Sequence, residues 1–169
     1  MNTILVQMSE KAWTMQALHL ACALARNSTA KLVLARLIEV QHYSYLGTPF
    51  GNSDPTPQEY DDIQEYAATA EDYGVELTVR MMQCANPLEA MADAADHLDS
   101  AVVFAHIPSS RIPYWAEIQT WLLKRRLAAG QRQLFTLARP PQPETYAPSI
   151  TVEPAHTPPH SQHAGLPKS

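Results

Sequence analysis

Glycine is scarce in this sequence, with five in 169 residues: Gly47, Gly51, Gly74, Gly130 and Gly165. A phosphate-binding loop depends on glycine, because its backbone N–H groups must approach the anion closely. None of the five lies where a predicted strand turns into a predicted helix. The sequence therefore contains neither the dinucleotide-binding fingerprint nor the P-loop, and no other residue replaces glycine well at such positions.

Cysteines, long apolar runs and basic stripes are also rare or missing. Cys22 and Cys84 form neither a metal-ligand spacing nor a disulfide framework, which favours small buried thiols in the reducing cytoplasm. No run of about 18 apolar residues occurs, so we expect no membrane span, and the first residues carry no secretory pattern. A net charge of −5 without a basic stripe argues against nucleic acid as the main partner.

Predicted strands alternate with predicted helices along the first four-fifths of the chain. The apolar runs predict strands over residues 3–8, 31–38, 75–82, 101–105 and 134–138. Helical spacing fills the intervals 9–27, 56–74 and 86–98, and a last helix ends before Gly130. This order predicts βαβ units, and hence an α/β fold: a five-stranded parallel sheet between four helices, in a Rossmann-like three-layer sandwich.

Helix starts and buried faces can be predicted in more detail. Thr56, Pro57 and Glu59 form a capping box with proline at the first helical position, and Asn86 with Pro87 repeats this pattern. Apolar spacing predicts a buried stripe on each helix. The predicted stripe residues are Leu18, Ala21, Cys22 and Ala25, widened by Leu20 and Leu24; then Tyr60, Ile63, Ala67 and Ala70; then Leu88, Met91, Ala92, Ala95 and Leu98; and last Trp115, Ile118, Trp121 and Leu122.

Proline is unevenly distributed. Six of the 14 prolines lie in residues 1–138 and eight in residues 139–169, between Ser, Thr, His and Gln. Such a segment cannot bury enough apolar area to offset its ordering entropy. We therefore expect an α/β domain over residues 1–138 and a mostly disordered tail over 139–169. Three tail histidines (His156, His160 and His163) reflect composition rather than a metal site, and we expect none.

A ligand site, if one exists, should lie at the carboxyl ends of the strands, as in other open parallel sheets. The candidate residues there are Ser9, His106, Ser109, Ser110 and Arg111. A Ser–His pair could act in nucleophilic catalysis and the arginine could hold an anion. The alternative is that the serines cap the next helix and the arginine is solvated. No nucleophile elbow supports a hydrolase, so we expect no enzyme and no catalytic residue.

Aromatic residues and charges of one sign cluster towards the end of the domain. Tyr114, Trp115 and Trp121 form a stripe that either belongs to the core or anchors an interface. Residues 54–99 contain twelve acidic residues and one basic residue, whereas residues 111–132 contain five basic residues and one acidic residue. The bases either suit the end of a helix dipole or meet an acidic face on another subunit or a partner protein.

The order of elements and several short sequence segments resemble those of the universal stress protein family. The resemblance lies in residues 3–6, 31–40, 73–76, 86–90 and 102–104, and extends over residues 2–138. It implies the α/β fold named above. Many family members bind ATP through an Asp after the first strand and a Gly-x2-Gly-x9-Gly-Ser/Thr run after the fourth.

None of these signature residues is present when the family pattern is laid on without gaps. The Asp position falls on Ser9, the three glycines on Ala105, Pro108 and Ile118, and the final hydroxyl on Gln119. Pro108 also removes a backbone donor. The resemblance therefore implies the fold and disfavours ATP as a cofactor.

Family members often form homodimers through the last strand, which implies a contact through Leu134, Phe135, Thr136 and Leu137. We expect a non-enzymatic domain that works by protein–protein contact, as a dimer or as an accessory or regulatory subunit. A protein partner could also bind through Trp115 and Trp121. The alternative is a stress sensor that binds a nucleotide or small anion in a remodelled strand-end crevice.

Overall fold

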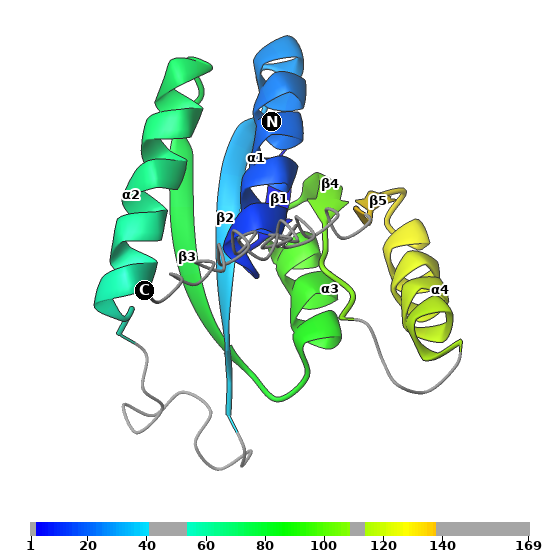
Figure 1. Cartoon of the computed structure of the whole chain (residues 1–169). Helices are drawn as coiled ribbons and strands as arrows, with labels where there is room; N and C mark the ends of the chain where they lie inside the picture. Colours follow the sequence, from blue (N-terminus) through cyan, green and yellow to red (C-terminus); the bar gives the residue numbers. More distant parts are fainter. Residues whose placement is uncertain (1–2, 41–53, 109–113, 138–169) are drawn as a thin grey trace, which may run out of the picture.

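A computed structural model describes residues 3–40, 54–108 and 114–137 of the chain. Strands and helices alternate as the sequence predicts (Figure 1). The strands are β1 (Thr3–Gln7), β2 (Lys31–Glu39), β3 (Leu77–Cys84), β4 (Ser100–Phe104) and β5 (Gln133–Phe135). The helices are α1 (Lys11–Ser28), α2 (Pro57–Asp72), α3 (Pro87–His97) and α4 (Trp115–Ala128).

The five strands form one parallel sheet in the order β3-β2-β1-β4-β5. The central strand β1 pairs on both sides, so that Val6 lies opposite Leu34 on β2 and Phe104 on β4. The chain builds outwards from β1 to β3 and then returns to the other side of β1. The boundary between β1 and β4 is therefore the topological switch point, where ligands bind in open α/β sheets.

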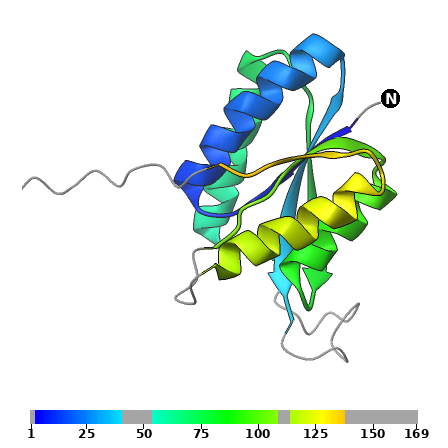
Figure 2. The ribbon, with the colours of Figure 1, turned by 90° about the vertical axis from the view of Figure 1, so that its right-hand side faces the viewer.

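Two helices cover each face of the sheet, which confirms the three-layer prediction (Figure 2). On one face, α1 and α2 bury a core that includes Trp13, Tyr66 and Phe104. On the other face, α3 and α4 bury a core that includes Met91 and Leu127. Each face therefore has its own apolar layer, and the two layers share only the sheet between them.

The predicted helix starts of α2 and α3 are confirmed. The Thr56 hydroxyl accepts from the Glu59 backbone N–H at 3.2 Å, and the Thr56 N–H donates to the Glu59 carboxylate at 2.8 Å. The Asn86 side chain accepts from the Leu88 N–H at 3.0 Å. By contrast, α4 has no side-chain cap, and its N-cap residue Tyr114 adopts the left-handed conformation with φ 63°.

The predicted buried faces of α2 and α1 are only partly confirmed. On α2 the buried residues are Asp62, Tyr66 and Ala70, whereas Tyr60 and Ala67 are exposed. Asp62 can be buried because Lys11 on α1 pairs with it at 2.9 Å, and the bulky Tyr66 then faces the sheet. On α1 the residues Leu18, Ala21, Cys22 and Ala25 are buried as predicted, but Leu20 and Leu24 are exposed.

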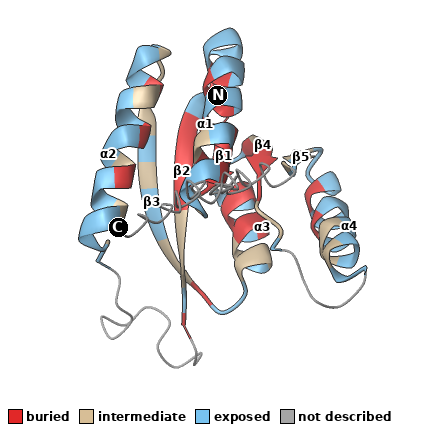
Figure 3. Ribbon diagram, in the orientation of Figure 1, coloured by how far each residue is buried: buried red, intermediate tan, exposed pale blue. Residues whose placement is uncertain are grey.

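The predicted buried face of α4 is wrong. The helix packs inwards through Leu123 and Leu127, while the four predicted core residues are exposed by 43 to 56%. These four are Trp115, Ile118, Trp121 and Leu122. Figure 3 shows α4 red only on its inner side. The helix carries apolar residues on two opposite sides. The prediction took the side with the larger side chains as the buried one, because periodicity does not distinguish between the two.

The remaining domain-level expectations have different outcomes. Cys22 and Cys84 are free and buried, and burial raises the pKa of the Cys22 thiol to about 11. Within the described ranges, no helix is long and apolar enough to cross a membrane. The predicted tail over 139–169 lies outside the described residues, so its disorder stays a prediction.

Candidate functional site

The structure brings together two of the five candidate residues at the switch point. Ser9 follows β1 and His106 follows β4, and the Ser9 Oγ lies 2.9 Å from the His106 Nδ1. The other three candidates, Ser109, Ser110 and Arg111, lie outside the described residues. A hydrogen-bonded serine and histidine thus connect the ends of the two strands between which a ligand of this fold class would bind.

Three residues that were not among the predicted candidates hold this pair in place. The Gln7 side chain accepts from the His106 backbone N–H at 3.0 Å. The buried Thr14 hydroxyl accepts from the Ser9 N–H at 2.8 Å. The Trp13 ring meets the imidazole edge-on, with centroids 5.2 Å apart. We call these five residues the strand-end cluster; a local signal existed only for Trp13 and Thr14, which lie in the first turn after Ser9.

The geometry of the strand-end cluster is compatible with nucleophilic catalysis and also with a purely structural role. A serine hydroxyl within hydrogen-bond distance of an imidazole is the pairing of a nucleophile with its base. The same hydrogen bond also satisfies the Ser9 hydroxyl and the His106 ring beside the buried Trp13. Pairing partly buried polar groups in this way would stabilise the contact between the ends of β1 and β4. Among the described residues, no group of His, Cys, Asp and Glu could hold a metal ion.

The basic side chains on the α1–α2 side of the site form ion pairs within the chain. Lys11 contacts both Asp62, at 2.9 Å, and Glu65, and these carboxylates raise its pKa. Arg36 on β2 donates two hydrogen bonds to Glu59, at 3.0 and 2.9 Å. Chiefly through this contact, the pKa of Glu59 falls to about 2. These cations are therefore neutralised within the chain.

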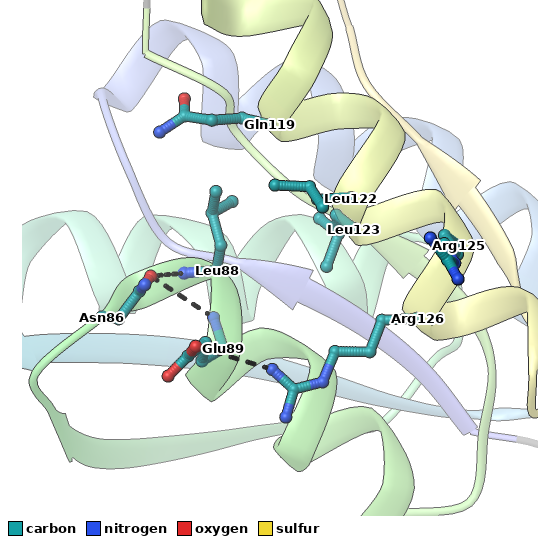
Figure 4. Close-up of a pocket in the computed structure, with 8 residues that line it drawn as sticks. All are labelled: Asn86, Leu88, Glu89, Gln119, Leu122, Leu123, Arg125 and Arg126. Atoms are coloured by element: carbon teal, nitrogen blue, oxygen red, sulfur yellow. Dashed lines mark hydrogen bonds and ion pairs between the residues drawn. The ribbon is translucent and has the colours of Figure 1, made fainter.

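A groove of about 450 Å³ lies between α3 and α4. Its lining residues are Asn86, Leu88, Glu89, Gln119, Leu122, Leu123, Arg125 and Arg126 (Figure 4). Arg126 points across the groove to Glu89 at 3.9 Å and also reaches Asp93 at 3.5 Å. The segregated acidic and basic stretches of the sequence therefore meet partly inside one chain, which neither sequence interpretation foresaw.

The chain resembles known proteins in its fold but not in its sequence. No protein-family profile matches the chain, and no curated protein matches it in sequence. Among solved structures, a universal stress protein in complex with cAMP aligns with a TM-score of 0.61 and 16% identity, over 81% of this chain and 97% of the other. The chain has the universal stress protein fold.

Two further structures of universal stress proteins support the same fold. UspA from Lactobacillus plantarum aligns with a TM-score of 0.58 and 13% identity, over 81% of this chain and 97% of the other. A protein from Archaeoglobus fulgidus aligns with a TM-score of 0.51 and 13% identity, over 82% and 94%. The resemblance inferred from the sequence is thus confirmed at the level of the fold.

In this universal stress protein fold, the segment after β4 offers few backbone donors to an anion. The Ala105 N–H donates to the Phe135 carbonyl on β5 at 3.1 Å. The His106 N–H is held by Gln7, and Pro108 has no N–H. Three of the four described residues from 105 to 108 therefore cannot donate to a phosphate from their backbone.

Among the described residues, α4 carries more exposed large apolar side chains than any other helix or strand. We call Trp115, Ile118, Trp121, Leu122 and Arg125 the outer face of α4. At 100° per residue they fall on one side of the helix, opposite Leu123 and Leu127. The Arg125 guanidinium lies 5.4 Å from the centre of the Trp121 ring, within the range of a cation–π contact.

Proposed function

We propose that this chain is a non-enzymatic domain of the universal stress protein fold that acts in the cytoplasm through protein–protein contacts, without ATP. The observation that carries this proposal is the outer face of α4. Its two tryptophans are exposed by 43 and 56%. The buried reduced cysteines agree with a reducing compartment.

The composition of α4 supports a contact on its outer side. A helix that is apolar on opposite sides is normally covered on both, yet within the described part of the chain α4 is buried only along Leu123 and Leu127. Trp and Arg are also the residues that contribute most to binding energy at protein interfaces. A protein partner on the outer face would complete the burial that this helix pattern requires.

The strand-end cluster supports the absence of ATP. The N–H groups of His106 and of the neighbouring Ala105 are engaged by Gln7 and Phe135, and the His106 ring packs against Trp13. A triphosphate would have to displace these contacts without gaining a glycine-rich backbone in return. This argument concerns the phosphates and leaves the alternative below open.

The alternative function is a sensor that binds a nucleotide or small anion at the strand ends. One structure with this fold was solved in complex with cAMP. The Ser9 hydroxyl and the His106 ring could contact such a ligand if the bond between them opened. This function would use the remodelled crevice instead of the outer face of α4.

A dimer through the last strand receives limited support. Strand β5 lies at the edge of the described sheet and spans three residues. Leu134 and Leu137 pack into the two cores, and Phe135 stacks on Phe104 with ring centroids 5.1 Å apart. Only Phe135 and Thr136 of the four predicted contact residues are exposed.

Two measurements test the proposed function. The full chain is used to capture proteins from extracts of cells that express it naturally, alongside Trp121→Ala and a control variant, Tyr60→Ala, at an exposed aromatic on α2. We expect a near-stoichiometric partner, or the chain itself, that is lost only with Trp121→Ala. Equilibrium dialysis with ATP and cAMP should show no binding at millimolar ligand; saturable binding that requires His106 would favour the sensor instead.

A further inference from the structure

We propose, building on the proposed protein-contact function, that the outer face of α4 and the adjoining α3–α4 groove bind a segment of a partner protein that combines apolar and acidic residues, with one of its carboxylates paired to Arg125. Three features of the molecule support this: the continuity of the surface, the surroundings of Arg125 and the distribution of charge. The chemistry of the partner is what they add to the proposed function.

The outer face of α4 continues into the groove between α3 and α4. Leu122 and Arg125 belong to both, since they are part of the outer face and also line the groove (Figure 4). The apolar lining residues are Leu88 from α3 and Leu122 and Leu123 from α4. With a volume of about 450 Å³, the groove has room for an apolar side chain of a bound segment. Neighbouring residues of that segment can then cover Trp121, so apolar area is buried on both sides of Leu122.

Arg125 is a cation among apolar side chains. It follows Ile118 by seven residues, Trp121 by four and Leu122 by three, so the four side chains share one side of the helix. Its guanidinium lies 5.4 Å from the centre of the Trp121 ring, and among the described residues it forms no ion pair. A carboxylate brought there by an apolar segment would be partly shielded from water, which strengthens its hydrogen bonds to the guanidinium.

The acidic residues beside the groove contact a different arginine. Glu89 is the one acidic residue among the described lining residues, and it faces Arg126 at 3.9 Å. Asp93, one turn further along α3, also contacts Arg126, at 3.5 Å. After the contacts within the described chain are counted, positive charge therefore remains at Arg125.

The wider distribution of charge favours an acidic segment at α4 over a basic one. Residues 54–99 contain twelve acidic residues and one basic residue, whereas residues 111–132 contain five basic residues and one acidic residue. An acidic segment is therefore repelled by the first stretch and attracted to the second. A basic segment, or a second copy of α4, would meet like charges at Lys124, Arg125 and Arg126.

Selection of random peptides of about 16 residues, displayed on phage and bound to the full chain, tests the chemistry of the partner. We expect the enriched peptides to share apolar residues with Asp or Glu between them, and to contain few Lys or Arg. The same selection on the Arg125→Glu chain should lose this preference for acidic residues. Enriched peptides without acidic residues, or no enrichment above that on the Trp121→Ala chain, would overturn the inference.

Fluorescence anisotropy of the most enriched peptide tests the contact with Arg125. Arg125→Glu should weaken binding at least about tenfold, because a repulsion replaces the ion pair. The matched control, Lys124→Glu, changes the charge equally at the next residue, about 100° round the helix and outside the groove lining. It should weaken binding less than about threefold. Circular dichroism melting verifies that both variants fold; equal losses of affinity would mean that only net charge matters, and would contradict the assigned contact.

Further outcomes separate this inference from the proposed function. Sedimentation equilibrium of the chain alone should show no association that depends on Trp121. A dimer lost with Trp121→Ala would mean that a second copy covers the outer face, which would overturn the inference. If a protein captured from extracts through Trp121 binds the Arg125→Glu chain equally well, the inference fails while the proposed function stands. If nothing binds through Trp121, both fail.

Discussion

The three tryptophans of this chain lie in two helices with opposite surroundings. Trp13 on α1 is 1% exposed, whereas Trp115 and Trp121 on α4 are about half exposed. Helix α1 packs on the central strands β1 and β2 and beside α2, whereas α4 packs on the edge strand β5 and beside α3. The comparison teaches that an edge helix has an uncovered side, and that large apolar residues on this side indicate a contact surface.

Replacing the buried tryptophan tests the first half of this comparison and has the largest expected effect. Trp13→Ala removes a fully buried side chain that also supports the His106 ring. We expect the free energy of unfolding in urea to fall by about 3–5 kcal/mol. The matched change, Trp115→Ala, should alter it by less than about 0.5 kcal/mol at low protein concentration. Equal losses would mean that Trp115 is also core.

The same contrast can be tested within α4 alone. Leu127 is 1% exposed and Leu122 is 51% exposed. Leu127→Ala should lower the free energy of unfolding by about 2–4 kcal/mol, because it leaves a cavity in the α3–α4 core. Leu122→Ala should cost about 0.5 kcal/mol or less in the monomer. A reversed order in chemical denaturation would show that the helix presents its other side to the sheet.

Acid sensitivity should originate on the α1–α2 face. The pKa of Glu59 lies near 2 instead of 4.5, mainly because Arg36 donates to the carboxylate. Such a depressed pKa adds stability above pH 4.5, and this stability is lost as pH falls from 4.5 towards 2. Glu59→Gln should therefore cost about 1 kcal/mol at pH 7 and much less at pH 2.5. Urea unfolding at pH 7, 4.5 and 2.5 measures this; a pH-independent cost would contradict the cause.

The start of α4 gives the smallest expected effect. Tyr114 holds a positive φ of 63°, which disfavours side chains with a Cβ, and its side chain is 77% exposed. Tyr114→Gly should therefore raise stability by about 0.5 kcal/mol, since glycine adopts this conformation freely. The start of α3, which has a side-chain cap, offers no such gain: Asn86→Gly there should lower stability slightly. A loss with Tyr114→Gly in thermal melts would mean that the ring makes contacts that outweigh the strain.

The order of strands and helices and the caps of α2 and α3 could be predicted, because periodicity and capping are local signals. The inward sides of α2 and α4 could not. Asp62 is buried only because Lys11, from another helix, lies beside it. Trp121 is exposed only because nothing in the described chain covers an edge helix on that side. Both facts depend on neighbours that are distant in sequence.

The candidate site could be predicted in position but only partly in composition. The switch-point rule correctly placed Ser9 and His106 at the ends of β1 and β4. The role of Gln7 was missed, because its side chain accepts from the residue 99 positions further along the chain. Such long-range hydrogen bonds follow no sequence motif and become visible only once the strand register is known.

The contrast between Trp13 and the outer face of α4 can be measured most directly by fluorine NMR of the full chain labelled with 5-fluorotryptophan. At 10 µM, the account predicts one signal shielded from solvent and two accessible signals, assigned by single Trp→Phe variants. When the partner captured through Trp121 is added in excess, the two accessible signals should shift and become protected together, while the Trp13 signal stays unchanged. Trp115 and Trp121 signals that remain the same on this addition, or an accessible Trp13, would contradict the assignment of the outer face of α4 as the contact surface.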